Sequence, residues 1–322
     1  MAVANPDEIE RLLDEATAGR RAALARLLSV VERGGDGARA LGRLAHPRGG
    51  TAYTVGITGA PGAGKSTLTN ALCAAVRRDD ERIAVLAIDP SSPFSGGAIL
   101  GDRIRMGDHA LDDGVFIRSM ATRGHLGGLS LATPSAVRVL DAVGFPWVIV
   151  ETVGVGQVEV EIVGSADTCV VVVNPGWGDA IQANKAGLME IADVFVINKA
   201  DRMGAADTRN DLEGMLSLRV DEGWRPPVVS AVATSGEGVD ETWGAVADHR
   251  RWLDESGEGD RRRLSRVSAE LRSIIAVQLA ARAAKLGGGA RFDELRGDVF
   301  ARKLDPWSAV DDVLAAIAPD PG

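Results

Sequence analysis

The chain has 322 residues, of which 45% are hydrophobic and 25% charged, and its formal net charge is −9. This profile is that of a folded globular protein and excludes a disordered or collagen-like chain. Nucleic acids and anionic membranes attract proteins of opposite charge, so we expect neither as a partner. The length suits one α/β domain with smaller additions at its ends.

The cysteine content and the apolar runs indicate in which cellular compartment the protein is expected. Cys73 and Cys169 form no CxxC pair, so neither a disulfide framework nor a thiolate zinc site is expected. The first residues, MAVANPDEIERLL, lack a basic segment followed by an apolar one, and no apolar run approaches the roughly 20 residues of a membrane span. We therefore expect a cytoplasmic protein.

Helical periodicity runs from residue 6 to residue 33 and predicts an N-terminal helical extension within residues 1–50, closed by Gly34 and Gly35. Between residues 51 and 254, short apolar runs alternate with helical stretches. The seven runs are TVGIT, RIAVLAID, VFIRS, WVIVET, TCVVVVN, DVFVINK and PPVVSA. They predict an α/β fold with a doubly wound, mostly parallel sheet.

After Asp254 the pattern is helical throughout, which predicts a C-terminal helical arm over residues 255–322. The expected helices run from Leu264 to Lys285, from Phe292 to Leu304 and from Pro306 to Ala318. The basic run at residues 261–263 favours a solvated helix start, with a phosphate-binding patch as the alternative.

The segment GAPGAGKS at residues 59–66 matches the phosphate-loop pattern GxxxxGK[ST] between a strand and a helix. Backbone N–H groups of such a loop converge on phosphate oxygens, Lys65 reaches the β and γ phosphates, and Ser66 offers a hydroxyl to Mg²⁺. The predicted phosphate-binding residues are Gly59, Ala60, Pro61, Gly62, Ala63, Gly64, Lys65, Ser66 and Thr67. The alternative is a tight turn without a ligand.

The segment NKAD at residues 198–201 follows a strand, at the edge where such sheets bind ligands. Asp201 can accept the ring N–H and the amino group of guanine, whereas adenine would pair badly with it. Asn198 can hold the loop and meet N7, and the stem of Lys199 can lie over the base. The residues expected to close over the base edge are Ser230, Ala231 and Val232. The alternative for Asp201 is a helix N-cap.

Three carboxylates are candidate Mg²⁺ ligands together with Ser66, since this ion prefers hard oxygen donors. Asp89 ends the second predicted strand, Asp102 lies in GGAILGDRIRM, and Glu151 ends the fourth. The alternatives are strand-end caps for Asp89 and Glu151 and an ordinary loop charge for Asp102. The four histidines are scattered, so His109 and His125 are expected to be satisfied loop residues rather than metal ligands.

The segments IDPSSPFSGGAILGDRIRM, ETVGVGQVEVE, GDAIQANKAG and NKAD, behind the phosphate loop, resemble the MeaB/MMAA family of P-loop GTPases, also named ArgK. The resemblance runs from about Tyr53 to Trp252, and the helical ends suit the family's N-terminal extension and C-terminal dimerisation arm. It implies a homodimeric, Mg²⁺-dependent GTPase that converts GTP to GDP and phosphate. Members are chaperones of adenosylcobalamin-dependent acyl-CoA mutases, which gate cofactor loading and help eject damaged cofactor. The implied partner is such a mutase, alone or with its adenosyltransferase.

The resemblance also implies roles for single positions. Asp89 and Asp102 match acidic positions of the first switch, and Glu151 replaces the Asp that other GTPases commonly have in the Walker B position. Residues 154–159 match the second switch and residues 178–187 the third. The predicted catalytic residues are Lys65, Glu151, Gln157 as a candidate for orienting water, and Lys185, for which a solvated helix residue is the alternative.

Two departures and three rival functions remain open. Val158 and the segment QANKAG replace the serine and the more basic third switch of many members. A metal-delivery GTPase would need clustered Cys or His ligands, which the sequence lacks. A P-loop small-molecule kinase would need an acceptor site, and NKAD argues against ATP. A module that holds GTP without turnover is the third rival.

Overall fold

The computed structural model describes residues 5–89, 109, 111–121, 128–152, 166–176, 190–218, 223–286 and 290–315. Residue contacts divide the chain into two units, Met1–Arg266 and Val267–Gly322. Among the described helices, none is both long and apolar enough to cross a membrane.

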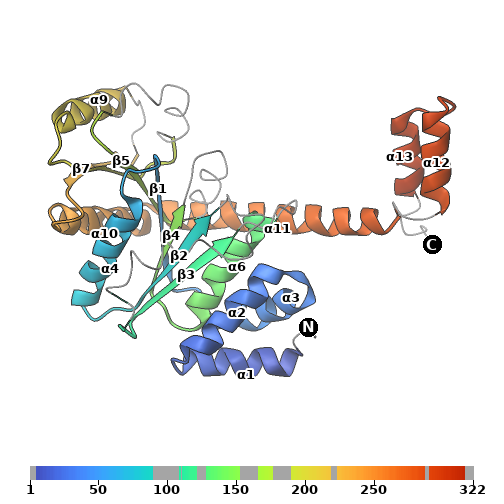
Figure 1. Cartoon of the computed structure of the whole chain (residues 1–322), viewed down its shortest axis with the longest axis horizontal. Coiled ribbons are helices and arrows are strands. Elements are labelled where there is room, and N and C mark those ends of the chain that lie inside the picture. The colour runs from blue at the N-terminus through green and yellow to red at the C-terminus, as the bar shows by residue number, and fades with distance from the viewer. Residues whose placement is uncertain are drawn as a thin grey trace. The chain divides into compact units, whose positions relative to one another are not determined.

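The first unit is built on a seven-stranded sheet (Figure 1). The strands are β1 (Tyr53–Gly59), β2 (Ile83–Asp89), β3 (Val115–Ala121), β4 (Trp147–Thr152), β5 (Thr168–Val173), β6 (Val194–Asn198) and β7 (Val228–Ala231). Their order is β3-β2-β4-β1-β5-β6-β7, and every pair is parallel. The predicted α/β fold and all seven strands are thereby confirmed. Because the strands are parallel, their carboxyl ends share one edge, which carries the predicted nucleotide motifs.

Helices cover both faces of the sheet, as a parallel sheet requires. Along β2, Ala84 and Leu86 pack on one side and Ile83 and Val85 on the other, so successive side chains enter different cores. The flanking helices are α4 (Lys65–Arg78), α6 (Gly128–Ala142), α9 (Ala205–Ser217) and α10 (Val239–Ser256). Helix α6 shares the first core, α4 and α10 share the second, and α9 covers β5 and β6.

The N-terminal extension is helical, as expected, but it contains one helix more than its periodicity indicated. Its elements are α1 (Pro6–Thr17), α2 (Arg21–Arg33), α3 (Gly35–Ala45) and the short 3-10 helix η1 (His46–Arg48). Gly34 ends α2 at φ 68°, yet the chain starts α3 at the next residue instead of leaving the helical segment. Ile9, Leu13 and Leu27 are fully buried in the core that these helices share with α6 and β2.

Several polar contacts attach this extension to the rest of the first unit, among them the pairing of Arg118 of β3 with Glu32 of α2 at 2.7 Å. Arg21 of α2 donates to the carbonyl oxygens of Asp112 and Val115 at 2.9 and 2.8 Å, at the start of the outer strand β3. The Asp141 carboxylate at the end of α6 accepts N–H bonds from Gly50, Thr51 and Ala52, in the segment that leads into β1. The α2 contacts hold the extension against the outer strand β3, and the Asp141 contacts join the end of the extension to α6.

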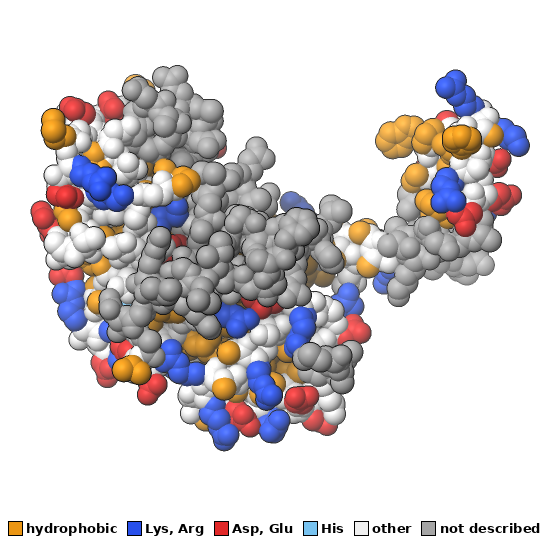
Figure 2. Space-filling model, in the orientation of Figure 1, with side chains coloured by type: hydrophobic (Ala, Val, Ile, Leu, Met, Phe, Trp, Pro, Cys, Tyr) orange, Lys and Arg blue, Asp and Glu red, His pale blue; other side chains and the backbone are white. Residues whose placement is uncertain are grey.

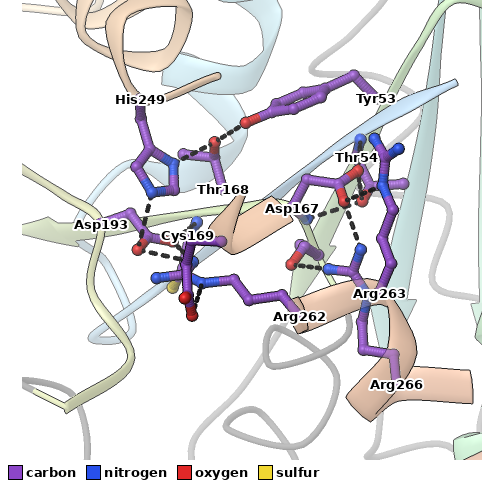
Figure 3. A network of polar contacts seen from close by, with 12 residues as sticks. Tyr53, Thr54, Asp167, Thr168, Cys169, Asp193, His249, Arg262, Arg263 and Arg266 are labelled. Atoms are coloured by element: carbon purple, nitrogen blue, oxygen red, sulfur yellow. Dashed lines mark hydrogen bonds and ion pairs between the residues drawn. The ribbon is translucent and has the colours of Figure 1, made fainter. Parts of the chain in front are cut away.

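Arginines in the first turns of α11 (Glu258–Leu286) bind carboxylates at the amino edge of the sheet (Figure 3). Arg262 lies 3.0 Å from Asp193, which precedes β6, while Arg263 and Arg266 pair with Asp167, which precedes β5. The expected helix start at the basic run is confirmed. Its expected solvation holds for Arg261 and Arg263, which are exposed, and is wrong for Arg262, which is partly buried because the buried Asp193 carboxylate requires a cationic partner.

The second unit contains the rest of α11 and a helical hairpin of α12 (Ala290–Phe300) and α13 (Pro306–Ala315). Leu295 and Ala309 are buried in this unit. The Asp305 carboxylate accepts N–H bonds from Trp307 and Ser308 at 2.9 and 3.1 Å and so caps the start of α13. Figure 2 shows apolar side chains on the surface of the hairpin, which includes the exposed Phe300 and Trp307.

Candidate functional site

The phosphate loop connects β1 with α4. Two of its glycines have left-handed φ angles and no space for a side chain: a Cβ on Gly59 would collide with the carbonyl of Val172, and one on Gly64 with the side-chain amide of Asn198. The loop therefore needs glycine at these two points. It turns directly into the N-terminus of α4, where free backbone N–H groups favour an anion.

Lys65 stands at the first position of α4, and its side chain folds back over the loop. The ammonium donates to the carbonyl oxygens of Gly59 at 2.7 Å and Ala60 at 3.2 Å, and the residue is buried. Its positive charge thus lies against the backbone of the predicted phosphate site, as the sequence indicated.

Ser66 and Glu151 meet beside this loop. The Ser66 hydroxyl donates to Glu151 Oε1 at 2.5 Å, and Glu151 is only 1% exposed. Glu151 is brought there by the sheet register, which places it opposite Ile57 of β1. A hydroxyl and a buried carboxylate side by side form a pair of hard oxygen donors of the kind that Mg²⁺ accepts.

The other predicted switch and metal residues are described less completely. Asp89 ends β2 at the carboxyl edge of the sheet, and the structure describes its backbone alone. Asp102, Gln157 and Lys185, with the segments 154–159 and 178–187, lie outside the described residues, as does His125. Among the residues that the structure does describe, no group of three or more His, Cys, Asp or Glu could hold a metal ion.

Asn198 joins the predicted base loops to the phosphate loop. Its side-chain amide donates to the carbonyl oxygen of Ala63 at 2.8 Å and accepts the N–H of Ala233 at 3.1 Å, and the residue is buried. Lys199, at φ 59°, donates through Nζ to the carbonyl oxygen of Gly62 at 2.6 Å. Three segments far apart in the sequence therefore meet at one edge of the sheet.

Asp201 is exposed in the turn that follows these contacts. Helix α9 begins only at Ala205, and its N-cap is Gly204. The N-cap alternative for Asp201 is therefore wrong, and its carboxylate is available to a ligand. The backbone N–H of Ala200 donates to the carbonyl oxygen of Ala231 at 3.0 Å, so Ser230, Ala231 and Val232 lie beside this turn.

A contact that the sequence did not indicate anchors the segment before β3. Arg77 of α4 binds Asp112 at 2.9 Å, and this bond lowers the pKa of the Asp112 carboxyl. His109 is buried, and its Nε2 lies 3.1 Å from the carbonyl oxygen of Asn70, also in α4. His109 is thus a satisfied loop histidine, as expected. Both contacts fix the chain next to the predicted first switch against the phosphate-loop helix.

A family model described as "Methylmalonyl Co-A mutase-associated GTPase MeaB" matches residues 24–286. A Pyrococcus abyssi protein named as a GTPase is 49% identical over 313 residues, which cover 96% of this chain and 97% of the relative. The mouse mitochondrial "Methylmalonic aciduria type A homolog" is 34% identical over 269 residues, covering 78% of this chain and 65% of that protein.

The fold comparison agrees with these matches. A crystal structure titled "LAO/AO transport system kinase" superposes with a TM-score of 0.72 and 28% identity, and covers 98% of this chain and 99% of that one. The likeness thus includes the helical ends as well as the sheet. Together with the phosphate loop and the NKAD turn at one sheet edge, these matches establish that the chain is a GTPase of the MeaB family.

Proposed function

We propose that residues 59–67 hold the phosphates of GTP and that residues 198–201 and 230–232 hold its guanine. The observation that supports this assignment best is the double contact of Asn198 with Ala63 and Ala233. It fixes the distance between the phosphate loop and both base loops, so one nucleotide can span them. The exposed Asp201 carboxylate then selects guanine, because it accepts two hydrogens that adenine does not offer.

Ser66, with Glu151 and the acidic positions Asp89 and Asp102, would hold Mg²⁺. The ion would polarise the phosphates and neutralise charge that develops on them. Lys65 and the backbone N–H groups of the loop stabilise the charge on the transferred γ-phosphoryl group while water attacks in line. Buried Glu151 orients the Ser66 hydroxyl through their 2.5 Å bond. Gln157 is the candidate for orienting the water, on the resemblance alone.

We expect Ser66→Ala to weaken GTP binding more in Mg²⁺ than in EDTA, about tenfold more, because the hydroxyl would act through the ion. Isothermal titration with and without the metal measures the difference. Thr69→Ala, which changes a buried hydroxyl of α4 one turn further on, is the matched control and should give the same ratio as the unchanged chain. An equal loss in both buffers for Ser66→Ala would remove Ser66 from the metal site.

For the cellular role, we propose a GTP-driven chaperone of an adenosylcobalamin-dependent acyl-CoA mutase, which gates cofactor loading and reactivation, with or without the mutase's adenosyltransferase. The mutase named in the family description and the mouse relative support this role. Candidate partners are methylmalonyl-, ethylmalonyl-, isobutyryl- and hydroxyisobutyryl-CoA mutases. Of the rivals, metal delivery lacks support in the described part of the chain, where no ligand cluster is found.

We further propose that the chain acts as a homodimer through α11. Five apolar side chains along this helix are at least half exposed, at spacings of three and four residues that place them on one face. They are Leu264, Val267, Leu271, Ile275 and Leu279. A continuous apolar stripe of this kind is typical of a helix that packs against another helix.

If GTP and GDP forms bind the mutase with different affinities, linkage requires the mutase to change nucleotide affinity by the same factor. We expect a fivefold to 150-fold difference, for couplings of about 1 to 3 kcal/mol. Titrations of GTP and GDP with and without each candidate mutase measure it, and an acyl-CoA enzyme that lacks cobalamin is the control. Lys185→Ala, in the segment matched to the third switch, should reduce the difference while GTP binding alone stays nearly intact.

If none of the cobalamin mutases changes nucleotide affinity or turnover, the chaperone role fails while the GTPase activity stands.

A further inference from the structure

Strand β7, which carries the second base loop, is short and lies at the edge of the sheet. It has four residues, of which Val228, Val229 and Ser230 are only partly buried, and among the described strands it pairs with β6 alone. The contacts from Asn198 and Ala200 reach the loop from the inner side. An outer strand with so few sheet bonds opens more easily than a central one unless something holds its outer side.

Arg209 of α9 provides that second hold. Its guanidinium donates to the carbonyl oxygen of Val228 at 2.8 Å and to the hydroxyl of Ser230 at 2.9 Å. Glu213, one helical turn further on, accepts a third bond from it at 3.2 Å and orients the fork. Ser230 itself begins the segment expected to close over the base.

We propose that Arg209 is a positioning residue for guanine recognition, which holds Ser230, Ala231 and Val232 at the correct distance from Asp201. The inference rests on the base loops assigned above. Helix α9 starts four residues after Asp201, and β7 leads into residues 230–232. The guanidinium contacts of Arg209 therefore connect both base loops to the same helix. Lysine could not replace it fully, because one ammonium cannot reproduce the planar two-pronged contact.

In our proposal, this loop lies at the purine edge that carries the 6-oxo group in guanine and hypoxanthine. Adenine has an amino group there, so ADP must bind mainly through its phosphates. Loss of the Arg209 contacts should therefore weaken GDP and IDP binding together and leave ADP binding unchanged. A simple loss of folding stability would not change the ratio of GDP to ADP affinity in the folded protein.

The test measures GDP, IDP and ADP affinities for Arg209→Met, Arg209→Lys and Ser230→Ala. We expect Arg209→Met to lower GDP and IDP affinity about tenfold with ADP within twofold of its starting value, and Arg209→Lys to fall between. Arg209→Met should also lower GDP affinity less when it is introduced into the Ser230→Ala variant than when it is introduced into the unchanged chain. Arg251→Met is the matched control, since Arg251 is exposed and pairs with Asp248 at 3.0 Å on α10.

Unchanged GDP affinity in Arg209→Met, a parallel fall for ADP, or full additivity with Ser230→Ala would each overturn the proposal. Asp201→Asn, measured in parallel, separates this failure from a wrong base site. If Asp201→Asn changes the ratio of GDP to IDP affinity and Arg209→Met changes nothing, Arg209 alone is excluded. If neither variant has an effect, the assignment of the base loops fails too.

Discussion

Asp201→Asn is expected to turn a guanine preference into a xanthine preference. The aspartate accepts hydrogen bonds from the ring N–H and the 2-amino group of guanine. Asparagine has one acceptor oxygen for the ring N–H, and its amide nitrogen is a donor that faces the 2-position. That pattern repels the 2-amino group and matches the 2-oxo group of xanthine. Each bond to a charged group contributes about 1.5 to 3 kcal/mol, so GTP should lose roughly tenfold to a hundredfold in affinity and XTP should gain relative to it.

Titration of GTP and XTP against both forms measures this change. Asp201 is well suited to the test because it is exposed and caps no helix, so its replacement should leave folding unchanged. Asp211→Asn, an exposed carboxylate of α9, is the matched control and should leave both affinities as they were. An unaltered ratio of GTP to XTP affinity in Asp201→Asn would exclude this side chain from base recognition.

The features that the sequence predicted well are those set by neighbouring residues. Buried parallel strands appear as short apolar runs, and the glycines at 59 and 64 are required by backbone angles and close contacts within a single loop. The NKAD turn was predicted for the same reason, because it directly follows a strand. Even there, the contact of Asn198 with Ala63 spans 135 residues, and the expectation that Asn198 holds the loop named no partner for it.

The features that the sequence did not predict depend on partners that are distant in the chain. Nothing near the basic run at residues 261–263 indicates that its arginines pair with Asp167 and Asp193 at the amino edge of the sheet. In the sequence, nothing distinguishes Arg209 from an ordinary exposed helix residue, and only the fold brings it next to β7. Periodicity also failed to predict α3. The glycines at 34 and 35 were expected to close the helical extension, but a glycine can end one helix and allow the next to start.

His249 belongs to the same amino-edge network (Figure 3). It is fully buried, with Trp224 and Trp252 against its ring at centroid distances of 4.9 and 5.7 Å. Its Nδ1 lies 2.8 Å from the Thr168 hydroxyl, and its Nε2 lies 3.3 Å from Asp193 Oδ1. A neutral ring accepts the Thr168 hydroxyl at Nδ1 and carries its proton on Nε2, which faces Asp193.

Burial, reinforced by the Arg262 charge, lowers the pKa of His249 from 6.5 to about 3. Between these values the unfolded chain binds a proton that the folded chain does not, so the free energy of unfolding falls as the pH falls. The slope from this group is about 1.4 kcal/mol per pH unit below 6.5. Asp167 adds its own loss only below pH 4: burial opposes its charge, but Arg266 and Thr54 lower its pKa below 3.8.

The two windows overlap only below pH 4, so unfolding between pH 7 and pH 5 separates the histidine from Asp167. We expect the chain to lose about 2 kcal/mol of unfolding free energy through His249 over this interval.

Urea unfolding at several pH values measures this loss in comparison with His249→Asn, which keeps an acceptor near Thr168 but cannot take up a proton. That variant should be less stable at pH 7, because it leaves space among the tryptophans, yet its pH dependence should be flatter by the same 2 kcal/mol. Equal slopes for His249→Asn and the unchanged chain would mean that folding does not lower the pKa of His249, and a difference of the opposite sign would mean that its imidazolium pairs with Asp193.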